Sequence, residues 1–392
     1  MVEFLLKVLF WSSIFILYMV YHGYGELLKI ICSVKSHSIS TIKSVNLPLV
    51  TVLLTVFNEE RKILNRLNNL LETDYPLERL QILVASDGST DRTHEIVEDL
   101  ALRYPISLFV SEDRLGKTGT QNQTIKFCLG DIVIFTDADT EFSRNTIHEL
   151  VAPFSNPNVG AATGHVIFRN AGNKISEAQT TYWDYELVLR SLESRLGILA
   201  VMAGPCMAVR KSVLQPMPEF VGEDCVVPLQ VAIQGYQVIH CHNAVAFDMM
   251  DSNPNREFKT RVRMTLRNWM GTLYYRQLLN PVKYPGYAFS LYFHKIFRWL
   301  SPIFLIVATI ATLFLATERL YALFSACFIL LYVVATFGWI LEGQGRKLPI
   351  VSTVFAFILA NCGFMVGLIK FLKGQKIIAY QAGQLNDARI KK

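Results

Sequence analysis

The distribution of hydrophobic residues divides the chain into two kinds of sequence. Four stretches are almost uninterruptedly apolar and are each about 20 residues long, which is the length a helix needs to cross a bilayer. They cover residues 4–21, 299–316, 321–341 and 349–369. The sequence between the first two has the mixed composition of a globular domain. The pattern predicts an N-terminal transmembrane anchor with a linker, a globular domain ending in membrane-interface helices, and a C-terminal helical cluster with a tail, at residues 1–44, 45–285 and 286–392.

The first apolar stretch fits either an uncleaved anchor or a cleaved signal peptide, because both have a short polar start and an apolar core. Only Lys7 interrupts this stretch. Residues 18–24, which follow its core, are bulky and aromatic and offer no small-residue cleavage site. We therefore predict an uncleaved anchor.

Short apolar runs alternate with amphipathic segments inside the globular region. Strands are predicted at residues 49–56, 80–85, 106–110 and 131–136. The first of these runs is apolar throughout and rich in β-branched residues, as expected of a strand that is buried on both faces of a parallel sheet. Helical periodicity follows the first two runs. This alternation predicts an α/β fold with a mostly parallel sheet, in which ligands bind at the carboxyl ends of the strands.

Polar clusters lie at those predicted strand ends. Asp87 follows the second strand and is open to two interpretations, as a helix N-cap or as an acceptor for a nucleotide base or ribose. Asp137 and Asp139 follow the fourth strand and are separated by one small residue. Two carboxylates so close together repel each other unless a cation lies between them, so this pair predicts a divalent metal site; a solvated turn is the alternative.

Two further motifs have both a chemical and a structural interpretation. Gly116-Lys117-Thr118 is not the end of a phosphate-binding P-loop, since that motif needs a glycine five positions earlier and Ser111 stands there. Lys117 remains a candidate nucleotide contact. Glu223 and Asp224 open a predicted helix, where acidic residues are favoured by the helix dipole, but where a carboxylate could equally serve as a general base.

The composition supports a membrane protein. Hydrophobic residues make up 52% of the 392 residues and charged residues only 18%, against about 25% charged in an ordinary soluble domain. The net charge is +6, and clusters of Lys and Arg flank the apolar stretches. By the positive-inside rule these clusters belong to the cytoplasm, which places the globular domain there. Three full crossings after the domain would nevertheless carry Lys373 and Lys376 to the opposite side of the membrane, in conflict with the positive-inside rule.

Taken in order, the motifs resemble those of the family 2 glycosyltransferases of the inverting GT-A type. The similarity is to the membrane-embedded branch with hyaluronan, chitin and poly-N-acetylglucosamine synthases. Residues 57–60 (Phe-Asn-Glu-Glu) are similar to the family's Tyr-Asn-Glu-Glu element, and residues 86–91 (Ser-Asp-Gly-Ser-Thr-Asp) to its Asp-Asp-Gly-Ser-Thr-Asp. Gly-Lys, Asp-x-Asp and Glu-Asp elements follow at residues 116–117, 137–139 and 223–224. The resemblance covers nearly the whole chain and implies a GT-A-type, Rossmann-like catalytic domain with transmembrane helices.

The resemblance also implies roles for individual residues. In the catalytic step it implies Asp224 as general base, with Glu223 beside it, and Arg267 as the cation that stabilises the leaving diphosphate. It implies a nucleotide-sugar site formed by Phe57, Glu59, Asp87, Lys117, Asp137 and Arg263. Asp139 and Asp137 would hold Mg or Mn. Trp183 and Trp269 would contact the acceptor, although packing against the sheet is an equally good interpretation of Trp183.

One departure from the family bears on processivity. Processive members carry Gln-x-x-Arg-Trp at the entrance to the membrane. When Arg267 is placed on the family's Arg, Asn268 occupies the Trp position, and Trp269 comes one residue late. A basic amphipathic helix lying on anionic lipid is the alternative interpretation of this segment.

The sequence thus predicts an integral membrane protein whose catalytic domain faces the cytoplasm. We expect it to take a nucleotide sugar, UDP-linked, to build or extend a β-linked polysaccharide on a glycan or lipid-linked acceptor, with no nucleic acid partner. The close alternative is transfer of one sugar to a lipid or a short glycan. A non-catalytic membrane scaffold is disfavoured by the intact carboxylates, and a solute transporter by the scarcity of charge in the apolar stretches.

Overall fold

The globular part of the chain is built on one eight-stranded sheet. A computed structural model describes residues 1–34, 47–169, 174–249, 254–346 and 348–376. The strand order is β3-β2-β1-β4-β7-β6-β8-β5. The strands are β1 (Val50–Val56), β2 (Leu80–Ser86), β3 (Ile106–Val110), β4 (Ile132–Thr136), β5 (Glu141–Phe142), β6 (Val159–Arg169), β7 (Met207–Arg210) and β8 (Gln237–Met249).

The predicted mostly parallel α/β fold is confirmed. Strands β1 to β4 pair in parallel, as do β6 and β8. Strand β7 runs antiparallel to both β4 and β6, and β5 antiparallel to β8. The four predicted strands match β1 to β4 within one residue at each end. Strand β7 therefore lies in the middle of the sheet, next to the carboxyl end of β4, and runs in the opposite direction to the strands on either side of it.

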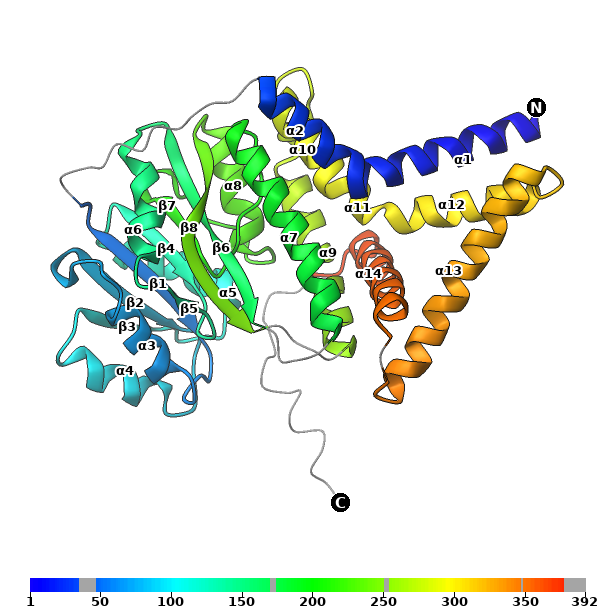
Figure 1. The fold of residues 1–392 in the computed structure, drawn as a ribbon. Coiled ribbons are helices and arrows are strands. Elements are labelled where there is room, and N and C mark those ends of the chain that lie inside the picture. The colour runs from blue at the N-terminus through cyan, green and yellow to red at the C-terminus, as the bar shows by residue number, and fades with distance from the viewer. Residues whose placement is uncertain (35–46, 170–173, 250–253, 347, 377–392) are drawn as a thin grey trace.

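Helices cover both faces of the sheet (Figure 1). Those of the globular part are α3 (Ile63–Leu71), α4 (Thr93–Ala101), α5 (Gly116–Thr124), α6 (Thr146–Val151), α7 (Lys174–Arg195), α8 (Glu223–Ile233) and α9 (Pro254–Tyr274). Val52 and Leu54 of β1 point to one face and pack in a core with Leu67 of α3. Leu53 points to the other face and shares a second core with Val227 of α8 and Leu266 of α9. The sheet is therefore buried on both sides, as the apolar β1 run predicted.

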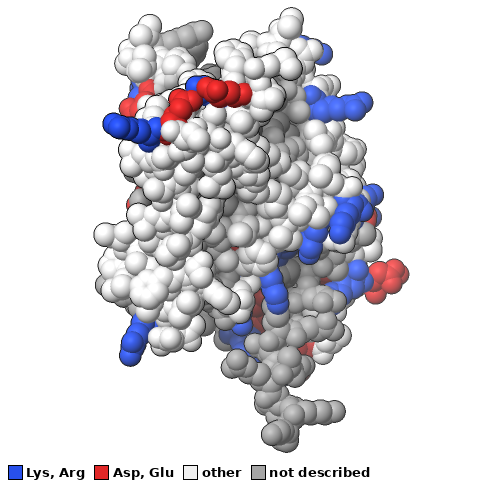
Figure 2. Space-filling view, turned by 90° about the vertical axis from the view of Figure 1, so that its right-hand side faces the viewer, with Lys and Arg blue, Asp and Glu red and all other residues white. Residues whose placement is uncertain are grey.

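Apolar helices from both ends of the chain lie together on one side of the globular part (Figure 1). They are α1 (Val2–Tyr18), the π-helical η1 (Met19–Gly23), α2 (Tyr24–Val34), α10 (Pro285–Ser290), the π-helical η7 (Leu291–Ile296), α11 (Phe297–Trp299), α12 (Ser301–Phe314), α13 (Arg319–Gly343) and α14 (Pro349–Leu372). Figure 2 shows that the face they form carries few charged side chains over most of its area. Three helical segments of the described chain are long and apolar enough to cross a membrane: residues 2–34, α13 and α14.

The predicted span at residues 299–316 differs from the prediction. The chain bends by 61° between the helical segment Pro285–Trp299 and α12, and only the two together would make a fourth span. Pro302 lies in the first turn of α12, where its missing N–H and its ring prevent the preceding helix from continuing straight through. Alone, the 14 residues of α12 reach about 21 Å, short of a hydrocarbon core of about 30 Å.

Helix α14 ends against the globular part of the molecule. It runs beside α9 (Figure 1), and Phe371 stacks on Trp269 of α9. Just beyond the helix, the Lys376 Nζ lies 4.8 Å from the centre of the Phe220 ring. Three full membrane crossings after the globular domain would have placed this end on the opposite side of the membrane from that domain. The structure instead brings it to the side of the sheet, in agreement with the charge pattern.

Candidate active site

The loops that follow β1 and β2 are fastened to each other at the carboxyl edge of the sheet. Asn58 has a φ of 54°, in the left-handed region that asparagine tolerates better than most residues. Its Oδ1 accepts a hydrogen bond from the Thr90 N–H at 2.8 Å, and its own N–H donates to Ser89 Oγ at 3.0 Å. These bonds hold the loop carrying Phe57 and Glu59 next to the loop carrying Asp87.

Asp87 anchors the start of α5. The side chain is only 5% exposed. Its Oδ1 accepts hydrogen bonds from the Leu115 and Gly116 N–H groups at 2.8 and 3.0 Å and from Thr120 Oγ1 at 2.8 Å. Asp87 therefore stabilises the start of α5, and the interpretation of Asp87 as the N-cap of the helix that follows it in the chain is wrong. Its predicted contact with the nucleotide stays a prediction.

Acidic and basic side chains alternate along this edge. The Lys62 Nζ lies 3.5 Å from Asp139 Oδ2 and 3.9 Å from Glu59 Oε2. Burial raises the pKa of Glu59, Lys62 opposes that shift, and the nearby carboxylates of Asp139, Asp91 and Asp137 raise the pKa further. The neighbouring Phe57 ring is covered by the Arg114 guanidinium at 3.7 Å. Asp137 and Asp139 thus lie among other carboxylates and have a lysine beside each of them.

Lys117 joins the sheet edge to the start of α8. Its Nζ lies 2.5 Å from Asp137 Oδ1 and 2.5 Å from Glu223 Oε1. Burial alone would lower the pKa of Lys117, but the two carboxylates outweigh it and raise the pKa above its ordinary value. For Glu223 burial acts to raise the pKa, and the charges of Lys117 and Arg267 bring it below the ordinary value. Lys117 is therefore a permanently charged link between two carboxylates.

Asp224 lies beside Arg267 at the N-terminus of α8. A Cβ on Gly222 would come within 2.4 Å of Asp224 Oδ1 and 3.6 Å of Arg267 Cζ, so any larger residue there would displace the Asp224 carboxylate. The Cys225 thiol donates to Asp224 Oδ1 at 3.4 Å, and burial raises its pKa, which keeps it protonated as a donor. Arg267 donates from Nη2 to Thr118 Oγ1 at 3.3 Å. Glu223 and Asp224 therefore lie close to Arg267, which comes more than 40 positions later in the sequence.

The carboxylates of this edge fit a divalent ion that is shared with a substrate. Within the described ranges, no cluster of three or more His, Cys, Asp or Glu side chains is arranged to hold a metal ion without further ligands. Mg²⁺ in phosphate-transfer and related sites is typically held by one or two carboxylates, with the remaining ligands from phosphates and water. Asp139 is half exposed, with 51% of its side chain accessible, and Asp137 is 30% accessible. Two accessible carboxylates match this donor set.

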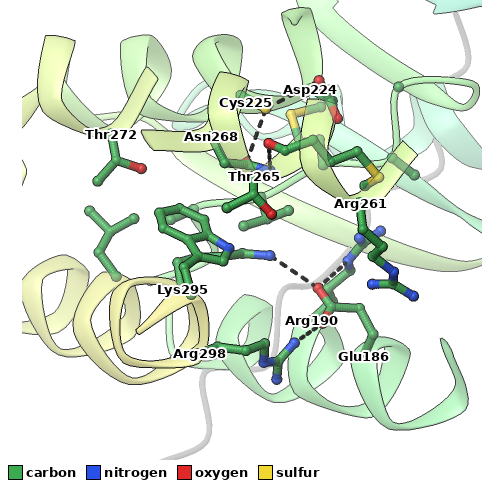
Figure 3. A pocket seen from close by; sticks show the side chains of 18 of the residues that line it. Glu186, Arg190, Asp224, Cys225, Arg261, Thr265, Asn268, Thr272, Lys295 and Arg298 are labelled. Carbon is green, nitrogen blue, oxygen red and sulfur yellow. Dashed lines mark hydrogen bonds and ion pairs between the residues drawn. The ribbon is translucent and has the colours of Figure 1, made fainter. Parts of the chain in front are cut away.

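A cavity of about 170 Å³ lies beside Asp224. Figure 3 shows Asp224 and Cys225 on one side of it, with Glu186, Arg190, Lys295 and Arg298 across from them. Glu186 Oε2 accepts a hydrogen bond from Arg298 Nη1 at 2.8 Å, and Glu186 Oε1 lies 3.3 Å from Lys295 Nζ. The cavity therefore connects the candidate base to a cluster of charged side chains between α7 and α11.

The remaining predicted site residues lie outside this junction. Trp269 is 7% exposed and packs between Trp299 and Phe371, with ring centres 5.2 and 5.8 Å away. It does not line the cavity, whereas Asn268 does. Arg263 lies on α9 four residues before Arg267 and is half-buried. The side chain of Trp183 lies outside the described residues.

The structure adds site residues that sequence reasoning missed. Arg66 of α3 is 3% exposed and donates from Nε to the Asp137 carbonyl at 3.1 Å and from Nη2 to Thr136 Oγ1 at 2.6 Å. Its signal was an arginine on the apolar face formed by Ile63, Leu67 and Leu70. Arg190 is a second buried arginine that was not expected at the site, and it lies on α7 four positions after Glu186. No motif marked it.

The sheet order, the two covered faces and the carboxylates at the strand ends define an α/β domain of the GT-A type. Residues 51–217 match the family model described as Glycosyl transferase family 2. This stretch, which holds the strands and carboxylates of the candidate site, is therefore similar to the family 2 glycosyltransferases.

Curated relatives and a solved structure agree with this assignment. The chain is 25% identical over 220 residues to the poly-beta-1,6-N-acetyl-D-glucosamine synthase of Staphylococcus epidermidis, which covers 55% of this chain and 53% of the relative. A synthase of the same name from Staphylococcus aureus is also 25% identical over 220 residues. The chain thus spans about half the length of the curated relatives it matches. The structure of the mannosyltransferase PcManGT from Pyrobaculum calidifontis, in complex with GDP-Man and Mn²⁺, matches with a TM-score of 0.71 and 21% identity over 96% of this chain and 100% of that one.

Proposed function

We propose that this chain is a membrane glycosyltransferase that transfers a sugar from a nucleotide sugar, UDP-linked, with inversion at the anomeric carbon, to build or extend a β-linked polysaccharide. The observation that carries this proposal is the junction at which Asp224 and Arg267 meet the Lys117–Asp137–Glu223 chain of ion pairs. The strand edge offers a place for the donor on one side of this junction, and the cavity offers a place for the acceptor on the other.

In the proposed step an acceptor hydroxyl attacks the anomeric carbon of the donor sugar. The Asp224 carboxylate takes the hydroxyl proton as the new bond forms. The bond to the nucleoside diphosphate breaks, and the diphosphate leaves with the electron pair. Arg267 stabilises the negative charge that develops on it. Glu223 and Lys117 fix the start of α8, which aims Asp224 at the cavity.

The strand edge is proposed to bind the donor. Phe57, Glu59 and Asp87 would contact the nucleoside, with Lys117 and Arg263 near the diphosphate. Asp139 and Asp137 would hold Mg or Mn, which would neutralise charge on the diphosphate. The complex of PcManGT with GDP-Man and Mn²⁺ supports a donor and a metal at this kind of site.

The polysaccharide product is supported by the poly-beta-1,6-N-acetyl-D-glucosamine synthases among the relatives. Transfer of a single sugar to a lipid acceptor is the second candidate. The cavity favours it, because Leu291, Trp299 and Phe364 of the apolar helices line it beside Asp224. We place the catalytic domain in the cytoplasm, on the charge pattern and on the position of Lys376 beside Phe220.

The proposal is tested by incubating the purified full chain with a panel of UDP- and GDP-sugars, each with Mg²⁺, with Mn²⁺ and with EDTA. We expect release of the nucleoside diphosphate with at least one UDP-sugar, in the presence of metal only. A radiolabelled donor then gives the product length, where a ladder supports the polysaccharide and a single added residue supports the lipid acceptor. If none of the nucleotide sugars released its nucleoside diphosphate, glycosyl transfer would be rejected and the interpretation as a non-catalytic scaffold would remain.

A further inference from the structure

The thiol of Cys225 lies between two oxygen acceptors beside the candidate base. Its Sγ is 3.4 Å from Asp224 Oδ1 and 3.1 Å from Asn268 Oδ1. Figure 3 shows the three residues together at the cavity that they line. A thiol has one proton and donates it to one acceptor at a time. The thiol proton therefore serves either the candidate base or a neutral amide.

The thiol keeps its proton in this environment. Burial raises the pKa of Cys225 and the charge of Asp224 raises it further, while Arg267 and Lys295 act in the opposite direction with a smaller effect. A cysteine that stays protonated is a weak hydrogen-bond donor and a poor nucleophile. Cys225 is therefore suited to hold a neighbouring oxygen in place and not to react itself.

The second acceptor, Asn268, is fixed on α9. Its Nδ2 donates to the Met264 carbonyl one turn earlier at 2.8 Å, which leaves Oδ1 as the atom that faces the thiol. Gly271, one turn later on α9, lies against the start of α8, where a Cβ would be 3.5 Å from Cys225 Cβ. The packing of α9 on α8 therefore holds the amide oxygen beside the thiol.

The charge of Asp224 decides which of the two oxygens is the better acceptor. A hydrogen bond to an ionised carboxylate is roughly twice as strong as one between neutral groups. A charged Asp224 therefore attracts the thiol proton, although Asn268 Oδ1 is the nearer oxygen. Once Asp224 has taken up a proton this advantage is lost, and the amide oxygen becomes the better acceptor.

We propose that Cys225 is a positioning residue for the general base. While Asp224 is charged, the thiol donates to its Oδ1 and fixes the carboxylate so that Oδ2 takes the proton of the acceptor hydroxyl. After this transfer the thiol donates to Asn268 instead. The sulfur keeps its own proton throughout, and the bonds that form and break are those of the proposed glycosyl transfer, on which this inference rests.

The acceptor of the thiol proton is measured by infrared spectroscopy of the detergent-solubilised full chain without substrate. Subtracting the spectrum of Cys225→Ala isolates the S–H stretching band of Cys225, and the same subtraction is made for each variant. We expect the band to move to higher frequency in Asp224→Asn, because the thiol loses a charged acceptor, and to stay nearly unchanged in Asn268→Ala. A band that moves in Asn268→Ala and not in Asp224→Asn would overturn the proposal.

The role in transfer is measured by the steady-state kinetics of nucleoside diphosphate release. Cys225→Ala should lower kcat by about three- to tenfold, as expected for the loss of one hydrogen bond, and leave the KM for the nucleotide sugar nearly unchanged. Cys225→Ser keeps a donor and should restore most of kcat. Cys128→Ala is the matched control, because the buried Cys128 thiol donates to the Thr124 carbonyl away from the cavity and its loss should leave kcat unchanged.

An unchanged kcat in Cys225→Ala would overturn the role in transfer. So would a loss that Cys225→Ser does not restore in protein with an unchanged Tm. If the unmodified chain released no nucleoside diphosphate from any nucleotide sugar, the proposed function would be rejected, whereas the infrared spectra would still show which oxygen accepts the thiol proton.

Discussion

Asp224 shows most directly how single residues form this site. Its side chain is placed by the first turn of α8, by the missing Cβ of Gly222 and by the Cys225 thiol. Lys117 and Glu223 then fix that turn to the sheet edge. The proposed chemistry depends on these short-range contacts, so it can be tested one side chain at a time.

Replacing Asp224 with Asn should abolish transfer and leave donor binding nearly unchanged. The amide keeps the size of the side chain but cannot take a proton, and general bases contribute about 10²- to 10⁴-fold to rate. Sugar transfer and nucleoside diphosphate binding are measured on the same preparation. A variant that retains full activity would remove Asp224 from the role of base.

Replacing Asp139 with Ala should weaken metal-dependent binding of the nucleoside diphosphate by about tenfold or more, because a carboxylate ligand of the ion is lost. Asp131→Ala is the matched control, since Asp131 is an exposed carboxylate at the opposite end of β4. Calorimetric titration with and without Mn²⁺ gives both affinities. Unchanged metal dependence in the Asp139 variant would contradict the assignment.

The pKa of Glu186 leads to a prediction about pH. Burial acts to raise this pKa, but His294, Lys295 and Arg298 hold it well below its ordinary value. A carboxyl whose folded pKa is depressed stabilises the protein above its unfolded pKa of about 4.3 and loses that contribution as pH falls through the folded value. We expect the Tm to stay level from neutral pH to about pH 5 and to fall below that.

Glu186→Gln should lower the Tm at neutral pH, since it leaves buried cations unpaired. It should also weaken the fall in Tm below about pH 4.3. An acid profile that matches that of the unmodified chain would exclude Glu186 as its source. Thermal scans of the two proteins across the pH range make this comparison.

Among elements, the contact between α9 and α14 connects the catalytic part to the apolar helices. Gly363 and Gly367 allow the close approach, because a Cβ on them would come within 2.8 and 2.7 Å of the Cβ atoms of Arg261 and Thr265. The sequence predicted both helices from their periodicity and apolar content. Their contact was not predictable, since the two glycines carry no signal that points to a partner about 100 residues away.

Gly367→Ala should destabilise this contact by about 1–3 kcal/mol, the usual effect of overpacking. Gly343→Ala is the control, because no atom lies within 4 Å of a Cβ built there and alanine favours a helix by up to about 1 kcal/mol. We expect a lower Tm for the first variant and an equal or higher Tm for the second. Equal changes in the Tm of both variants would show that the packing at Gly367 is not tight.

For the whole molecule, the apolar helices return the chain to the side of the globular domain. The Lys376 side chain contacts Phe220, whereas the turn between α12 and α13 lies at the far end of α12, away from the sheet (Figure 1). Lys373 and Lys376 therefore lie on the same side of the apolar helices as the globular domain, the side that the positive-inside rule predicts to face the cytoplasm.

Cysteines introduced at Lys376 and at the exposed Asp99 of α4 should react with an impermeant thiol reagent from the same side of sealed vesicles. A cysteine at Thr317, in the turn between α12 and α13, should react from the opposite side. The unmodified chain gives the background from Cys327 and Cys362, which are exposed on apolar helices. Labelling of all three positions from one side would contradict this topology.

The amino-acid sequence was sufficient for what depends on local pattern. Continuous β-branched runs specify β1 to β4, and apolar length specifies three of the four predicted spans. The polar residues after each strand must share an edge because parallel strands end together. Asp137, Asp139 and Asp87 were therefore placed correctly at the strand ends.

Contacts between distant segments were decided only by the tertiary structure. Lys117 bridges Asp137 and Glu223, Trp269 is buried between Trp299 and Phe371, and Arg190 and Arg298 face one cavity. Each depends on how helices pack in three dimensions. Side chains that pair across a cavity follow no periodic pattern in the sequence that would predict the pairing. The charged wall opposite Asp224 belongs to this second class.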